Sequence, residues 1–175
     1  MNYKTKLHTI KAFVFDVDGV FTNGMVLASG GDFLRMHNAK DGYAVRYAVN
    51  QGYPIGIITG GASESIRERF GMLGVTDVHL ASFNKIEHFA GFCRKHQIHP
   101  REVLCMGDDI PDMEILMQCG LPTCPADAVP EVKAICAYIS DRPGGMACVR
   151  DVIEQTLKLQ GKWNLPCSAA SLASS

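Results

Sequence analysis

The sequence lacks the features that mark several specialised classes of protein. Its 175 residues carry a formal net charge of −1, so no strong field of one sign attracts nucleic acid or an acidic membrane surface. No apolar run approaches the roughly 20 residues that cross a bilayer, and segment 1–11 lacks the apolar stretch of a signal peptide. We therefore expect a cytoplasmic protein that binds a small molecule and has neither nucleic acid nor a membrane as a partner.

Cysteine pairs with the spacing of a metal or redox site are also missing. The seven cysteines are odd in number and include no CxxC pair. Most of them lie within apolar runs, as Cys105 does in the run 103–106. This pattern favours small buried side chains in a reducing compartment over a disulfide framework or a zinc site.

What the sequence does contain is the composition of a single globular domain. Hydrophobic residues make up 47% and charged residues 20% of the chain, which suffices for a sizeable core. Short apolar runs alternate with longer segments of helical period, a pattern typical of a parallel sheet covered by helices on both faces. We therefore predict an α/β fold with a doubly wound, Rossmann-like parallel sheet, formed by one domain over residues 1–163.

The expected elements follow from the apolar runs and the residues that punctuate them. We predict strands at 11–15, 55–58, 77–80, 103–106 and 137–140, and helices at 41–51, 63–73, 84–96, 112–118 and 146–159. Asp41 is the predicted N-cap of the first of these helices, and Gly52 follows its end. Because parallel βαβ connections are right-handed, the residues that follow the strands should gather at one edge of the sheet.

One segment, residues 20–36, breaks the alternation. It contains Asn23-Gly24 and Gly30-Gly31 among the β-prone runs 25–27 and 33–34. Asn-Gly between such runs favours a β-hairpin, so we expect a small flap after the first strand and no separate cap domain. Residues 164–175 are rich in Ser and Ala, and we expect them to form a flexible tail.

Acidic side chains cluster directly after two of the predicted strands. Asp16 and Asp18 follow the first strand, whereas Asp108, Asp109 and Asp112 follow the fourth. In an open α/β sheet, ligands bind in the crevice beyond the carboxyl ends of the strands. Five carboxylates in one crevice repel each other unless a cation lies among them, and hard oxygen ligands suit Mg²⁺. We therefore predict a magnesium site.

The same crevice has the groups that phosphoryl transfer requires. Asp16 and Asp18 would point the same way from an extended backbone, so that one attacks phosphorus while the other donates a proton to the leaving oxygen. Thr59 and the following Gly60 offer a hydroxyl and backbone amides to phosphate oxygens. Lys85, near the start of a helix, can neutralise charge on the transferring group.

Each of these residues also has an ordinary structural explanation when it is taken alone. A lone Asp-x-Asp and a Thr before two glycines are common in surface turns, and Lys85 alone is typical of a solvated helix position. Asp108-Asp109 can simply begin a helix, because acids favour helix N-termini. It is the set of four pieces, in order and each after its own strand, that favours a catalytic site.

The four pieces resemble the signature motifs of the haloacid dehalogenase superfamily. Phe13–Val20 is similar to its first motif and Ile57–Gly60 to its second, while Lys85 matches the third motif and Gly107–Asp112 the fourth. The resemblance covers nearly the whole chain. Within the superfamily, the chain resembles the small capless phosphatases of 3-deoxy-D-manno-octulosonate 8-phosphate (KDO 8-phosphate).

Three features carry this narrower resemblance. His37–Tyr43 is similar to the family's Asn-x-(Arg/Lys)-Asp-Gly signature, a hairpin stands in place of a cap domain, and Gly144–Asp151 resembles a glycine-rich C-terminal element. The resemblance implies a magnesium-dependent hydrolase of a sugar-acid phosphate that works through an aspartyl-phosphate, in a step toward lipopolysaccharide. It also implies a homotetramer in which the flaps and tails of neighbouring subunits close each active site.

The resemblance assigns a role to each candidate residue. Asp16 would be the nucleophile and a metal ligand, and Asp18 the general acid and base, with its backbone carbonyl on the metal. The other candidates would hold the phosphoryl group (Thr59, Gly60, Lys85), the metal or its waters (Asp108 directly, with Asp109 and Asp112) and the anionic end of the substrate (Lys40, Arg150). For Lys40 and Arg150, a surface salt bridge is an equal alternative.

Three departures from the family pattern lie where the substrate would be selected. They are Leu80-Ala81 in place of Gln-Gly, Gly61-Ala62 in place of a charged residue after the second motif, and Met146 in place of Arg. A nine-carbon sialic-type acid 9-phosphate is therefore an alternative substrate. A receiver-type signalling module is an alternative of another class, but Asp18 opposes it, because a persistent phosphoaspartate needs no second Asp that catalyses turnover.

Overall fold

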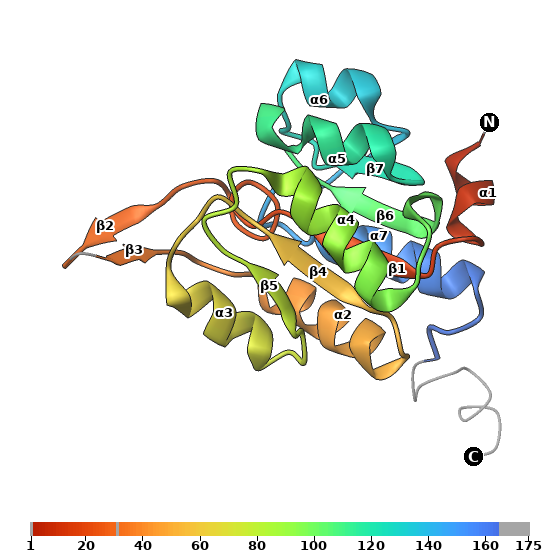
Figure 1. The fold of residues 1–175 in the computed structure, drawn as a ribbon, viewed down its shortest axis with the longest axis horizontal. Coiled ribbons are helices and arrows are strands. Elements are labelled where there is room, and N and C mark those ends of the chain that lie inside the picture. Colours follow the sequence, from red (N-terminus) through yellow and green to blue (C-terminus); the bar gives the residue numbers. More distant parts are fainter. Residues whose placement is uncertain (1, 31, 165–175) are drawn as a thin grey trace, which may run out of the picture.

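Six parallel strands form the centre of the molecule (Figure 1), in a computed structural model that describes residues 2–30 and 32–164. The strands are β1 (Ala12–Phe15), β4 (Ile55–Ile58), β5 (Asp77–His79), β6 (Val103–Met106), β7 (Leu121–Cys124) and β8 (Tyr138–Ile139), in the spatial order β5-β4-β1-β6-β7-β8. Because β1 pairs with β4 on one side and with β6 on the other, the chain winds in both directions from the middle of the sheet. The predicted doubly wound parallel sheet is confirmed.

Helices cover both faces of this sheet (Figure 1). One face is packed by α1 (Tyr3–Leu7), α2 (Ala39–Asn50), α3 (Glu64–Gly71) and α7 (Cys148–Leu159), and the other by α4 (Lys85–His96), α5 (Met113–Gln118) and α6 (Pro130–Ile135). Two short 3-10 helices, η1 (Pro100–Glu102) and η2 (Ile110–Asp112), precede β6 and α5. Burial from both sides explains why β1, β4 and β6 are uninterrupted apolar runs.

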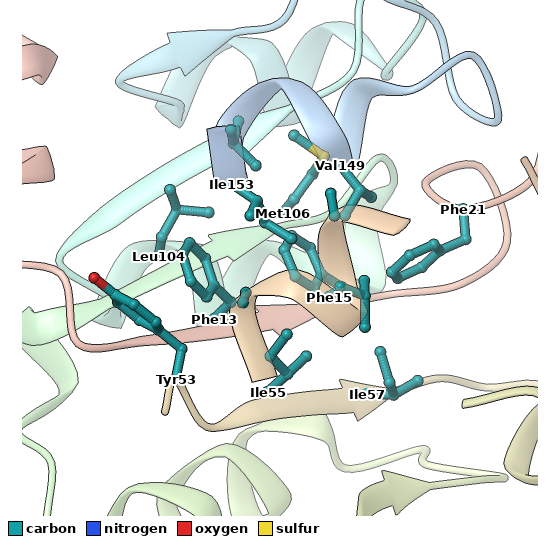
Figure 2. Packing of buried hydrophobic residues seen from close by; sticks show 14 of the residues in the cluster. Phe13, Phe15, Phe21, Tyr53, Ile55, Ile57, Leu104, Met106, Val149 and Ile153 are labelled. Atoms are coloured by element: carbon teal, nitrogen blue, oxygen red, sulfur yellow. The ribbon is translucent and has the colours of Figure 1, made fainter. Parts of the chain in front are cut away.

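The central strand β1 divides the core in two, because its side chains alternate between the faces. Phe13 and Phe15 pack beneath α2 and α7, close to Ile153 (Figure 2). Val14 faces the opposite way and packs with Phe92 of α4. Each fully buried side chain of this size stabilises the fold by roughly 1.5–3 kcal/mol. The strand that ends at Asp16 is therefore held from both faces.

The predicted hairpin is formed by β2 (Leu27–Ser29) and β3 (Asp32–Leu34), and it projects from the body of the molecule (Figure 1). Ser29 pairs with Asp32, so the chain reverses between these two residues. The expectation that Asn23-Gly24 marks the turn is wrong, because both residues precede β2. The described part of the chain inserts nothing else between β1 and α2, so it contains no separate cap domain.

The first turn of α2 also differs from the prediction. Its N-cap is Asn38, whose Oδ1 accepts a hydrogen bond from Lys40 N at 2.9 Å. The expectation that Asp41 is the cap is wrong, because Asp41 lies inside the helix, fully buried. Asp41 Oδ1 instead accepts a hydrogen bond from Arg150 N at 2.7 Å. It thereby satisfies a free N–H at the start of α7, as an acid at a helix N-terminus should.

The remaining expectations concern cysteines, the tail and membranes. The described cysteines are free thiols that are mostly buried, as expected of small apolar side chains (Cys93, Cys105, Cys119, Cys124, Cys136 and Cys148). The predicted tail, apart from Asn164, lies outside the described residues, as does Cys167. None of the helices in residues 2–30 and 32–164 has both the length and the apolar character that a bilayer span requires.

Candidate active site

The carboxyl ends of the central strands meet at one edge of the sheet, on either side of the position where the strand order reverses. Asp16 follows β1, Thr59 follows β4, Asp108 lies just beyond β6, and Lys85 begins α4. A cleft of about 520 Å³ opens there, lined by Asp16, Asp18, Gly24, Thr59, Gly60, Gly61, Ser82, Phe83, Lys85, Asp108, Asp109, Pro111 and Asp112. The fold thus brings together the four motifs that the sequence places after separate strands.

Lys85 is buried and holds two carboxylates at once. Its Nζ donates to Asp16 Oδ1 at 2.9 Å and to Asp112 Oδ1 at 2.7 Å. Burial alone lowers the pKa of Lys85, but the two carboxylates outweigh burial and the net shift of the pKa is upward. Lys85 therefore stays a cation inside the cleft, beside the carboxylate of Asp16.

Three carboxylates form a compact cluster of oxygens. One oxygen from each of Asp16, Asp108 and Asp112 lies within 4.8 Å of the other two. Burial, reinforced by the charges of Asp16 and Asp112, raises the pKa of Asp108 to about 7. Burial and the charge of Asp112 also raise the pKa of Asp16, although Lys85 opposes them. A divalent cation relieves such crowding, and this set of hard oxygen donors fits Mg²⁺.

Gly19 makes room for this cluster. Its φ is +84°, and a Cβ at this position would lie 2.0 Å from Asp108 Oδ2. Any other residue would therefore displace the Asp108 carboxylate and would also strain its own backbone. The glycine of the Asp-x-Asp-Gly motif is required because the loops after β1 and β6 touch here.

Thr59 and Gly60 form a turn beside the carboxylates. The Thr59 Oγ1 accepts a hydrogen bond from Gly61 N at 3.2 Å, and the Thr59 carbonyl accepts one from Ser82 N at 2.9 Å. The Oγ of Ser82 is buried and has no hydrogen-bond partner among the described residues. Because a buried hydroxyl without a partner is costly, this hydroxyl is a ready donor for a ligand in the cleft.

Asp18 stands apart from the three-carboxylate cluster. Its two oxygens face the guanidinium of Arg35, with Nε 2.7 Å from Oδ1 and Nη2 2.9 Å from Oδ2. Thr22 Oγ1 donates to Asp18 Oδ1 at 3.5 Å and accepts a bond from Gly19 N at 3.3 Å. Arg35 directly follows β3, so the base of the hairpin is tied to the residue that the family resemblance makes the general acid and base.

Asp109 and Asp112 differ in what their side chains contact. Asp112 Oδ2 accepts hydrogen bonds from Asp108 N at 3.1 Å and from Asp109 N at 3.5 Å, which fixes the loop after β6. Asp109 Oδ1 accepts a bond from Ile110 N at 2.7 Å and caps η2. Asp109 is exposed and lies outside the three-carboxylate cluster. Its part in metal binding stays a prediction.

Lys40 and Arg150 lie together, but in another hollow. This hollow of about 470 Å³ is bordered by the start of α2 and by α7, and it shares no lining residue with the carboxylate cleft. Arg150 Nε lies 2.9 Å from Glu154 Oε2, an ion pair at the surface of α7. Within one chain the two cations are not brought to the cleft, so their contact with substrate stays a prediction.

The segments His37–Tyr43 and Gly144–Asp151, which resemble family signatures, hold the loops of the site in place. Asn38 Nδ2 donates to Gly145 O at 3.0 Å, and Gly145 N donates to Val20 O at 2.9 Å. A Cβ at Gly144 would lie 2.0 Å from Gly19 O. The glycine pair thus packs directly against the loop that follows Asp16 and holds it in place.

Sequence reasoning misses three polar residues of the site: Thr22, Arg35 and Ser82. Arg35 gives a weak signal, because it is a cation placed directly after a β-prone run. Thr22 and Ser82 give none, because Ser and Thr are ordinary residues of turns. Whether such side chains point into a cleft depends on the path of the loops, which hydrophobic patterns do not define.

The chain has clear relatives among known proteins. A family model described as haloacid dehalogenase-like hydrolase matches residues 73–144, which include Lys85 and the Gly107–Asp112 loop. The 3-deoxy-D-manno-octulosonate 8-phosphate phosphatase KdsC of Salmonella typhi is 32% identical over 159 residues, which cover 90% of this chain and 85% of that protein. The chain therefore belongs to the KdsC family of haloacid dehalogenase-like hydrolases.

Solved structures of such phosphatases have the same fold. The KDO 8-phosphate phosphatase of Yersinia pestis superposes with a TM-score of 0.90 at 28% identity, over 92% of this chain and 88% of that chain. The enzyme from Moraxella catarrhalis, solved with magnesium, phosphate and KDO, gives a TM-score of 0.89 at 27% identity, over 99% and 98% of the two chains. The family predicted from the motifs is confirmed, and a receiver-type module is not supported.

Proposed function

We propose that the chain is a Mg²⁺-dependent phosphatase that converts KDO 8-phosphate to KDO and inorganic phosphate. One observation carries the proposal: Lys85 bridges two members of the three-carboxylate cluster, Asp16 and Asp112, at the carboxyl edge of the sheet. This arrangement supports phosphoryl transfer to a carboxylate. Membership of the KdsC family, and the KDO and phosphate bound to the Moraxella catarrhalis enzyme, support this particular substrate.

In the first step, a carboxylate oxygen of Asp16 attacks phosphorus, and the bond between phosphorus and the sugar oxygen breaks. Asp18 gives its proton to that oxygen, so the sugar acid leaves as an alcohol and Asp16 becomes an aspartyl-phosphate. Lys85 offsets negative charge on the phosphoryl oxygens, and the Thr59 turn orients them.

In the second step, water attacks the phosphorus of the aspartyl-phosphate. Asp18, now ionised, accepts a proton from that water, and the bond between phosphorus and the Asp16 oxygen breaks. Inorganic phosphate leaves and Asp16 is restored. One ester and one water thus give one sugar acid and one phosphate, with no net change in the protein.

Asp16, Asp108 and Asp112 would hold the magnesium ion, because their oxygens already lie together. When bound, the ion neutralises the crowded carboxylates and stabilises negative charge on the phosphoryl group. Asp18 is proposed to bind the ion through its backbone carbonyl, and Asp109 to support the ion or its bound waters.

Phosphate release from three esters tests this function. The purified protein is given KDO 8-phosphate, a nine-carbon sialic-type acid 9-phosphate and a simple aryl phosphate, each with Mg²⁺ and with chelator. We expect release that requires Mg²⁺ and a kcat/KM that is highest for the eight-carbon ester. Equal, weak hydrolysis of all three esters would keep the phosphatase chemistry but refute the substrate, whereas no hydrolysis with Mg²⁺ would refute the function.

We further propose that the active form is a homo-oligomer, a tetramer as the family resemblance implies. The hairpin supports this proposal, because it projects from the body and the segment around it exposes several large apolar side chains (Met25, Val26, Leu27, Phe33, Leu34 and Met36). Monomers rarely leave such a patch uncovered. Another copy of the chain that covers the hairpin would also give walls to a cleft that has no cap.

A further inference from the structure

Arg35 joins the hairpin to the body of the protein. Its guanidinium forms two parallel hydrogen bonds with Asp18, at 2.7 Å and 2.9 Å, while Nη1 donates to Phe33 O at 2.8 Å. The Arg35 side chain is only 7% exposed, whereas the Asp18 carboxylate is 30% exposed. The pair is therefore a charge-assisted fork that solvent reaches from the Asp18 side.

The turn after β4 leaves space for this guanidinium. A Cβ at Gly61 would lie 3.0 Å from Arg35 Nη2, so a longer side chain at position 61 would compete with the arginine for the same place. Gly61 also lines the cleft. The charged residue that the family pattern places after the second motif is absent from this chain, and Arg35 brings a charge beside that position from the hairpin.

The fork has a consequence for the proposed chemistry. To act as the acid, Asp18 must leave the ion pair and take up a proton from the solvent that reaches its side of the pair. It must then turn the protonated oxygen toward the oxygen that joins phosphorus to the sugar. While both carboxylate oxygens are held by Arg35, neither is free to do so. The paired arrangement is therefore a resting state, and some group must replace Asp18 as the partner of Arg35 before Asp18 can act as the acid of the first step.

The substrate carries a group that can replace Asp18. A sugar-acid phosphate is an anion at both ends, and the phosphoryl end is assigned to Lys85. Lys85 is the one cation among the described residues that line the cleft, so the carboxylate end needs another. Lys40 and Arg150 lie in a separate hollow, whereas Arg35 is paired with Asp18, which lines the cleft.

We propose that Arg35 is a positioning residue that responds to the substrate: it holds Asp18 in the empty cleft and moves to the sugar-acid part of the ester, which releases Asp18 to the leaving oxygen. This inference rests on the proposed phosphatase function and deepens it. Arg35, at the base of the hairpin, would thus respond to the leaving group, and an ester of a sugar acid would release the Asp18 that its own hydrolysis requires.

The test compares Arg35→Gln and Arg35→Lys with the wild type and with a control, Arg94→Gln, which changes an exposed arginine on α4. kcat and KM are measured for KDO 8-phosphate, for a neutral pentose 5-phosphate and for an aryl phosphate, whose leaving group needs no proton. For Arg35→Gln we expect kcat/KM to fall about tenfold or more with the sugar acid, the size of one lost charge-assisted contact. The pentose and aryl phosphates carry no carboxylate that could displace Arg35 from Asp18, so neither should lose kcat in this variant. Arg35→Lys should recover part of the loss with the sugar acid.

Two results would overturn this inference and leave the phosphatase function standing. One is an active wild type whose Arg35 variants match it on all three esters. The other is an equal loss on all three esters, which indicates a structural role only. Melting temperatures identify an unfolded variant, and if Arg35→Gln does not fold, Arg35→Lys decides the question through the same selectivity for the sugar acid. A wild type that hydrolyses no ester would refute the function itself, and the inference with it.

Discussion

At the scale of single residues, the site is built by crowding like charges around one lysine. Asp16 and Asp112 share the Nζ of Lys85, and Asp108 adds a third carboxylate to the cluster. Burial raises the pKa of both Asp16 and Asp108. The crowding therefore costs stability in the metal-free protein, as is common for groups that are arranged for a ligand.

Asp16→Asn should abolish turnover without unfolding the protein. The amide cannot attack phosphorus, so we expect kcat to fall by roughly 10³-fold or more. The melting temperature of the metal-free variant should be equal or higher, because a buried charge is lost while Lys85 keeps Asp112. Asp141→Asn, at a carboxylate that is 86% exposed, is the matched control and should change neither quantity. Substantial hydrolysis by Asp16→Asn would exclude Asp16 as the nucleophile.

Ser82→Ala should weaken substrate binding but not stability. The Ser82 Oγ is buried without a partner in the described structure, so its removal should leave the free energy of unfolding unchanged or raise it by about 1 kcal/mol. If this hydroxyl donates to the phosphoryl group, KM should rise roughly 3- to 10-fold. Ser140→Ala is the contrasting control, because Ser140 Oγ donates to Asp151 Oδ2 at 2.7 Å. That variant should lose stability and keep its KM, and the opposite pattern would contradict the role of Ser82.

Several of the site residues that the sequence predicts lie within one or two residues of the carboxyl end of a strand. Asp16 and Thr59 follow β1 and β4 directly, and Asp108 lies two residues beyond β6, so the parallel sheet alone brings them together. Arg35 and Ser82 depend instead on how loops fold over the sheet edge. Their positions follow from packing between segments that are distant in sequence, which no local pattern describes.

At the scale of elements, β5 and α4 are joined by a charged contact far from the cleft. Asp77, the first residue of β5, accepts a hydrogen bond from Lys95 Nζ at 2.6 Å, and its other oxygen lies 2.9 Å from His96 Nε2. Both partners lie in the last turn of α4. Burial alone raises the pKa of Asp77, but Lys95 and His96 outweigh it and the net shift is downward.

Asp77→Asn should therefore destabilise the fold in a way that depends on pH. Since the folded pKa of Asp77 is depressed, its ionised form adds stability above the ordinary value of 3.8, and this stability is lost as the pH falls through the lower folded pKa. We expect the variant to lose about 1–2 kcal/mol at pH 7, with a difference from the wild type that narrows below pH 3.8. Urea unfolding at several pH values measures it. A loss that is independent of pH would show that the charge of Asp77 does not contribute.

Two of the elements that the sequence does not predict, β7 and α6, are missed for local reasons. β7 contains Pro122, which lacks the N–H of a regular strand, and α6 is a helix of six residues that begins at Pro130. In β7 the proline and Thr123 interrupt the apolar run that marks the other central strands, whereas α6 is too short for a periodic pattern to develop. The cap of α2 fails for another reason: Asn38 and Asp41 both have the side chain of an N-cap, and only the position of α7 shows that Asp41 serves that helix instead.

At the scale of the whole molecule, the exposed hairpin is the feature that a single chain leaves unexplained. Leu27 is 66% and Phe33 54% exposed. If neighbouring copies cover these side chains, the double variant Leu27→Lys, Phe33→Lys should dissociate the oligomer and lower kcat/KM. Light scattering and the phosphatase assay measure the two effects. Met72→Lys, at an apolar side chain that is 68% exposed on the body, should remain assembled. A wild type that is monomeric and fully active would contradict this assembly.

The central claim is that the reaction passes through a phosphoryl group on Asp16, and trapping that species tests it most directly. Asp18→Asn removes the base of the second step, while an aryl phosphate needs no acid in the first. The variant is mixed with aryl phosphate and Mg²⁺, quenched in acid and mapped by peptide mass spectrometry. The mechanism predicts one added phosphoryl group on the peptide that contains Asp16. If wild-type turnover is fast but this peptide stays unmodified in the variant, or another residue carries the phosphate, the proposed mechanism is wrong.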